Sequence, residues 1–238
     1  MKILTFQHLA VEHPGIFRDF WRDAGHTTHI LPLDEGAQIP TLTDYDLLAV
    51  MGGPMDVWET EKHPWLAAEM QAIRTWITDL NRPYFGIYLG HQLLAEALGG
   101  KTGRMTTPEV GITTATLTAE GRKDPLFATL GPDLQAFQWH GAEVRTLPPN
   151  ATILAANPAC PVQAMRVGKH AWGIQFHIEM TPTTVAEWTA VPEYRASMEK
   201  ALGPTRAKGL HTELAPHLPT FNAMARQIND NLFRAITA

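Results

Sequence analysis

The most informative segment of this 238-residue chain is GIYLGHQ, residues 86–92. It overlaps the apolar run YFGIY, residues 84–88, which is typical of a buried strand, and it leads into a helical pattern. A sharp strand-to-helix turn of this kind lifts one side chain above the edge of a sheet. Gly86 and Gly90 flank position 88, as expected where neighbouring backbone comes too close for a Cβ atom. The segment therefore predicts that Tyr88 is the presented residue.

The rest of the N-terminal half alternates short apolar runs with helical patterns. Strands are predicted at residues 2–6, 29–33 and 47–51. Helices are predicted at residues 14–24 and 66–80, and in the second of these apolar residues recur at steps of three and four. This order is typical of βαβ units, so we expect an α/β fold with a mostly parallel sheet.

The pattern changes in the second half of the chain. From about residue 111 to 176, short strands with turn signals predict an antiparallel or mixed addition to the sheet. The remaining segment is largely helical. Because no internal repeat or linker is evident, we expect one domain, residues 1–238, with a core of about 1–190 and a helical segment of about 190–238.

Composition narrows the class of protein. The 19 Lys and Arg against 24 Asp and Glu give a formal net charge of −5, and no basic run occurs, so nucleic acid is not an expected partner. No run of about 18 apolar residues is present, so we expect no membrane span. One cysteine, Cys160, cannot form an internal disulfide, which suits a reducing compartment. We expect a cytoplasmic protein.

Four segments, in this order along the chain, resemble class I glutamine amidotransferases, close to stand-alone proteins related to the glutaminase domain of GMP synthase. They are MGGPM at 51–55, GIYLGHQLLA at 86–95, QWHG at 138–141 and GIQFHIE at 173–179. The resemblance implies a flavodoxin-like class I glutamine amidotransferase fold, with a mostly parallel central sheet flanked by helices and a small antiparallel extension. A ligand pocket is then expected at the carboxyl ends of the strands.

The resemblance also implies roles for single residues. His177 would be the general base and Glu179 the acid that orients it, because residues two apart on an extended segment project from one side. The N–H groups of Gly53 and Leu89 would form the oxyanion hole. The expected substrate-binding residues are Gly52, Gln92 and His140.

The chain departs from the family pattern at the presented position, where the family has Cys and this sequence has Tyr88. A Cys thiol has a reference pKa of about 8.5 and a phenol about 10, and ionising the phenol at neutral pH would take roughly 4 kcal/mol. The phenol oxygen also lies further from the backbone than a thiol sulfur and would overshoot a carbonyl held in the same oxyanion hole. We expect ordinary glutamine hydrolysis to be absent or very weak, with affinity for glutamine or a γ-glutamyl-like amide retained.

Several interpretations of Tyr88 stay open. Its ring could plug the pocket as a wedge with the hydroxyl on His177. Alternatively, His177 and Glu179 could act on a water or on the phenol to transform a different small amide or ester. Tyr88 could be the nucleophile itself, or an introduced change. A further alternative is a non-enzymatic partner subunit of a synthase.

Other chemistries find little support in the sequence. Cys160 lies in a turn without the strand-turn-helix context of a nucleophile, and we expect a small buried residue there. The 11 histidines show no His-x-x-x-His or His-Glu-x-x-His spacing, so no metal is expected. No cofactor motif or Walker-type phosphate loop occurs, and the expected ligand is a small molecule.

Overall fold

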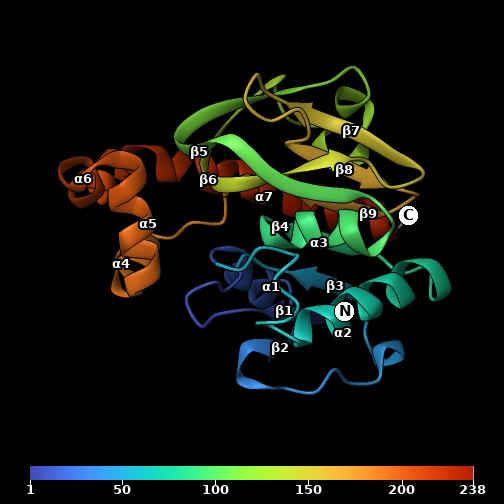
Figure 1. Ribbon diagram of the computed structural model, residues 1–238. Coiled ribbons are helices and arrows are strands. Elements are labelled where there is room, and N and C mark those ends of the chain that lie inside the picture. Colours follow the sequence, from blue (N-terminus) through green and yellow to red (C-terminus); the bar gives the residue numbers. More distant parts are fainter. Residues whose placement is uncertain (238) are drawn as a thin grey trace.

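The computed structural model describes residues 1–237, which form a mixed β-sheet with helices packed against it (Figure 1). One half of the sheet is parallel. Its strands are β1 (Lys2–Gln7), β2 (Thr27–Pro32), β3 (Leu47–Val50), β4 (Tyr84–Ile87) and β9 (Ala171–Ile174). They pair in the order β2-β1-β3-β4-β9. The strands predicted near residues 2–6, 29–33 and 47–51 are confirmed to within two residues.

The other half of the sheet is antiparallel. Its strands are β5 (Lys101–Leu117), β6 (Asp133–Thr146), β7 (Ala151–Ala156) and β8 (Ala164–Val167), and they continue the sheet in the order β9-β8-β7-β5-β6. The predicted antiparallel or mixed addition is confirmed, since the predicted range also contains the parallel strand β9. It begins ten residues earlier than expected and contains the two longest strands, of 17 and 14 residues. The first half of β5 is mostly exposed, so it lacks the apolar alternation that announces a strand.

The helices are α1 (Phe17–Asp23), α2 (Trp65–Arg74), α3 (Leu89–Ala97), α4 (Thr184–Ala190), α5 (Pro192–Leu202), α6 (Pro204–Leu214) and α7 (Leu218–Thr237). The predicted helix over 66–80 is confirmed, its last turn being a π-helical turn at Thr75–Asp79. The predicted helix over 14–24 begins later. Gly15 has φ +54°, and a Cβ there would lie 1.9 Å from the carbonyl oxygen of Glu179, so this residue serves a close backbone approach instead of a helical turn.

Two hydrophobic clusters lie on the two faces of the sheet. One contains apolar side chains of α1 and α7, such as Phe17 and Ile228, and the other those of α2 and α3, such as Ile73 and Leu93. Trp21 in α1 donates from Nε1 to Asn229 in α7 at 3.1 Å, which ties the last helix to the first. α4, α5 and α6 gather at one end of the sheet (Figure 1). Each helix within residues 1–237 is too short or too polar to span a lipid bilayer.

Candidate active site

Tyr88 stands at the apex of the turn between β4 and α3. Its backbone has φ +55° and ψ −105°, a conformation that a bulky residue rarely adopts. The turn is tight, because a Cβ on Gly86 would lie 2.6 Å from the Gly90 backbone and a Cβ on Gly90 would lie 2.2 Å from the carbonyl oxygen of Val50. The predicted strand-to-helix elbow is therefore confirmed, and the two glycines are present for the predicted steric reason.

His177 and Glu179 form a buried pair beyond the end of β9, the strand next to β4. His177 Nδ1 and Glu179 Oε1 are 2.6 Å apart, and Glu179 Oε2 accepts the Ile178 N–H at 2.9 Å. Because β4 and β9 are parallel, the residues that follow them emerge at one edge of the sheet, and the elbow and the pair meet there.

The electrostatics of the pair follow from its hydrogen bond. Burial opposes the charged form of His177, but the adjacent Glu179 carboxylate outweighs burial and raises the pKa of His177 above its ordinary value. Burial likewise opposes the Glu179 carboxylate, and its bonds to His177 and to Ile178 N–H outweigh this and lower the pKa of Glu179. An ionised Glu179 accepts only, so Nδ1 of His177 carries a proton and Nε2 is the nitrogen left for other chemistry.

The Tyr88 ring stacks on the His177 imidazole, with centroids 5.1 Å apart and planes 30° apart. The wedge interpretation expected the hydroxyl on His177. Within residues 1–237 the Tyr88 hydroxyl has no hydrogen-bond partner, so the contact between the two residues is the stacking of their rings. Burial raises the pKa of Tyr88, and nearby Glu12 and Asp56 raise it further, which is opposite to what a phenolate nucleophile needs.

The two predicted oxyanion-hole residues, Gly53 and Leu89, are neighbours. A Cβ on Gly53 would lie 2.9 Å from Leu89 Cδ2, so a larger residue there would press on the Leu89 side chain. His8, at the end of β1, was missed by the sequence reasoning: its Nδ1 lies 2.7 Å from the Gly52 carbonyl oxygen. A trans peptide points its C=O and N–H in opposite directions, so this bond sets where the Gly53 N–H points.

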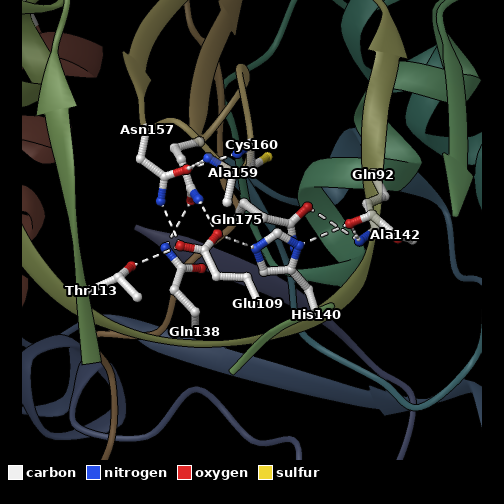
Figure 2. Close-up of polar contacts among 11 residues, drawn as sticks. Gln92, Glu109, Thr113, Gln138, His140, Ala142, Asn157, Ala159, Cys160 and Gln175 are labelled. Atoms are coloured by element: carbon white, nitrogen blue, oxygen red, sulfur yellow. Dashed lines mark hydrogen bonds and ion pairs between the residues drawn. The ribbon is translucent and has the colours of Figure 1, made fainter. Parts of the chain in front are cut away.

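The structure places two predicted substrate-binding residues, Gln92 and His140, in a buried polar network (Figure 2). Gln92 Nε2 donates to Gln175 Oε1 at 3.2 Å, and His140 Nε2 lies 3.2 Å from Glu109 Oε2. Glu109 also accepts from Thr113, Asn157 and Gln163. Neither Gln92 nor His140 lines the cavity beside Tyr88, and their role in substrate binding stays a prediction.

A cavity of about 150 Å³ lies next to Tyr88 and His177. It is lined by Glu12, Pro54, Tyr88, Trp139, His177, Trp188, Glu193, Tyr194 and Ser197. The sequence reasoning missed Glu12, Trp188 and Tyr194, because no local spacing links a loop after the first strand to the C-terminal helices. A larger cavity of about 680 Å³ among α4, α5 and α6 contains none of the predicted site residues.

Cys160 does not have the surroundings of a nucleophile. It is fully buried, and burial raises the pKa of its thiol to about 12. Its backbone N–H donates to Asn157 Oδ1 at 2.7 Å within a turn. The expectation of a small buried residue is confirmed.

A side chain presented at a strand-to-helix elbow beside a His–Glu pair defines an α/β protein of the nucleophile-elbow type. The family model described as "Glutamine amidotransferase class-I" matches residues 17–189, and the chain belongs to this family. It is 33% identical over 189 residues to "Putative glutamine amidotransferase-like protein YfeJ" of Salmonella typhimurium, covering 78% of both chains.

One further sequence relative and one solved structure support the assignment to this family. The chain is 34% identical over 147 residues to a glutamine-hydrolyzing GMP synthase subunit of Sulfolobus acidocaldarius, covering 61% of this chain and 73% of the relative. Its fold matches the crystal structure of a glutamine amidotransferase from Thermotoga maritima with a TM-score of 0.87 and 28% identity. That match covers 100% of this chain and 99% of the other.

Proposed function

We propose that this protein is a class I glutamine amidotransferase-like protein whose glutaminase step is impaired or absent. In this proposal Tyr88 takes the place of the family's nucleophilic Cys, and the site still binds glutamine or a small γ-glutamyl-like amide. The observation that carries the proposal is the position of Tyr88, at the elbow apex with its ring against His177.

Two properties of Tyr88 support the loss of the acyl-transfer step. Its raised pKa makes the phenolate rarer than in water, whereas a nucleophile needs its ionised form. Its ring stacks on the imidazole of His177, and in this proposal it fills the approach to the elbow and the base that a substrate carbonyl would need.

The retained His177–Glu179 pair supports a remaining ligand or reaction. A buried polar pair opposes folding unless it is well satisfied, and this one has a short hydrogen bond and an additional backbone donor. It therefore favours a second candidate, an enzyme with changed chemistry in which His177 activates a water on a different small amide or ester. The relatives named as subunits of GMP synthase support a third, a synthase partner.

Reversion of Tyr88→Cys tests the main proposal. We expect the purified wild-type protein to release no glutamate above background at high glutamine concentration. The reverted protein should release glutamate, because the elbow, the glycine turn and the His177–Glu179 pair proposed as the base and its orienting acid would then act on a thiol. Tyr88→Ala is the matched control, since it removes the ring without supplying a thiol. Wild-type turnover as fast as that of the Tyr88→Cys protein would contradict the proposal.

A further inference from the structure

We propose that the cavity beside Tyr88 binds the ammonium group of a small primary amine, with Glu12 as the carboxylate that accepts its N–H bonds. The inference rests on the proposed function in one respect, namely that this cavity is the ligand site. It goes further by assigning the charge of the ligand and the residue that recognises it.

Glu12 is a buried residue, and one of its two carboxylate oxygens has no hydrogen-bond partner in the protein. The residue is only 7% exposed and lines the cavity. Its Oε1 accepts the Tyr194 hydroxyl at 2.6 Å, whereas Oε2 has no hydrogen-bond partner among residues 1–237. Oε2 is not one of the fully buried polar atoms that lack a partner, so it stays accessible, and a ligand that donates to it would supply the missing hydrogen bond. If Glu12 only linked α5 to the loop after β1, its hydrogen bond with Tyr194 would be enough. That bond leaves Oε2 without a partner.

The charges around the cavity favour a cation over an anion. No Lys or Arg lines it within the part of the chain that the structure describes, whereas Glu12 and Glu193 do. His177 is paired with Glu179, so its charge is already balanced. Burial raises the pKa of Glu12, and the nearby charge of His177 offsets this only in part.

The walls of the cavity suit an organic cation. The ring centroids of Trp139 and Trp188 are 5.5 Å apart, and those of Trp139 and Tyr194 are also 5.5 Å apart. Aromatic faces attract ammonium groups, and more strongly where water is excluded. The volume of about 150 Å³ limits the ligand to a small molecule or to the ammonium-bearing end of a larger one.

Calorimetric titration of the full-length wild-type protein at neutral pH tests this directly. The probes are n-butylammonium chloride, butan-1-ol and sodium butanoate, which share a chain length and differ in charge. We expect n-butylammonium to bind at least about tenfold more tightly than butan-1-ol, as a charge-assisted hydrogen bond provides, and butanoate to bind least. Equal binding of the amine and the alcohol, tighter binding of butanoate, or no detectable binding of the amine would each overturn the proposal.

Glu12→Gln then assigns the preference to one residue. It should reduce n-butylammonium affinity by about tenfold or more and leave butan-1-ol affinity unchanged. Glu193→Gln is the matched control: this side chain is exposed, so its loss should reduce amine affinity no more than about fivefold. An unchanged preference in Glu12→Gln contradicts the proposal. Because the comparison of probes on the wild-type protein needs no variant, it stands even where Glu12→Gln does not fold.

The experiment is independent of the test of the proposed function. Glutamate release by Tyr88→Cys together with no preference for the amine would refute the ammonium site and keep the impaired amidotransferase. A preference for the amine together with an inactive Tyr88→Cys protein would support the ammonium site and refute the proposal that Tyr88 alone blocks glutaminase activity.

Discussion

His8 holds the carbonyl oxygen of Gly52 at 2.7 Å from Nδ1 while its Nε2 lies 2.8 Å from Glu69 Oε1. The two atoms that contact the imidazole nitrogens, the Gly52 carbonyl oxygen and Glu69 Oε1, are both acceptors. Burial lowers the pKa of His8, but Glu69 outweighs this effect and the pKa is raised. The imidazole also stacks on Trp65, with centroids 5.4 Å apart. A buried histidine–carboxylate pair therefore holds the carbonyl group of the glycine turn in place.

The two members of this pair should not contribute to stability independently of each other. His8→Ala leaves the Glu69 carboxylate buried and unpaired, and we expect it to lower the free energy of unfolding by about 3–5 kcal/mol. The double variant His8→Ala, Glu69→Ala should lose less than the sum of the two single variants, because no lone charge remains. Urea denaturation of the four proteins measures the coupling. Strict additivity would show that the pair is not coupled.

The contribution of the His177–Glu179 pair to stability should depend on pH. The raised pKa of His177 provides stability that is complete below its unfolded value and is lost as pH rises through its folded value. The lowered pKa of Glu179 provides stability that is lost as pH falls through its folded value. The difference in unfolding free energy between wild type and Glu179→Gln should thus be greatest between about pH 4.5 and 6.5 and shrink toward alkaline pH. A difference that grows above pH 7 would contradict the assigned direction for His177.

Gly15 should tolerate no side chain. In addition to its positive φ, a Cβ there would lie 1.9 Å from the Glu179 carbonyl oxygen, which also accepts the Ile16 N–H at 2.8 Å. We expect Gly15→Ala to lower the free energy of unfolding by more than about 3 kcal/mol. Gly25→Ala is the matched control, because Gly25 has φ +72° but open space around it, and it should cost only about 1–2 kcal/mol. Chemical denaturation compares the two, and similar losses would mean that the close approach is unimportant.

The two tyrosines around the elbow should respond differently to loss of their hydroxyl groups. Tyr84 donates to the Gly90 carbonyl at 2.7 Å in the core, so Tyr84→Phe should lower the free energy of unfolding by about 1 kcal/mol or more. The Tyr88 hydroxyl has no partner within residues 1–237, so Tyr88→Phe should stay within about 0.5 kcal/mol of wild type. Thermal denaturation measures both. A large loss in Tyr88→Phe would reveal a hydroxyl contact and favour the interpretations in which the phenol takes part in chemistry.

The parallel half of the fold was predictable because its signals are local. Buried strands such as β3 and β4 are continuous apolar runs, and the apolar side chains of α2 recur at helical spacing. The start of the antiparallel half was not predictable from the sequence. The first half of β5 is mostly exposed and is recognised as a strand only by its pairing with β6. The helix at α1 was placed too early because its local pattern carries no sign that Gly15 meets Glu179.

Part of the candidate site could also be predicted from local sequence, and part could not. The elbow, with Tyr88 between Gly86 and Gly90, could be predicted from seven consecutive residues, because the steric demand of a tight turn acts on immediate neighbours. The stacking of Tyr88 on His177, the brace from His8 and the approach of Glu12 to Tyr194 join segments up to 182 residues apart. Only the tertiary structure decides these contacts, because side-chain packing and buried charge depend on which distant segments share a wall of the cavity.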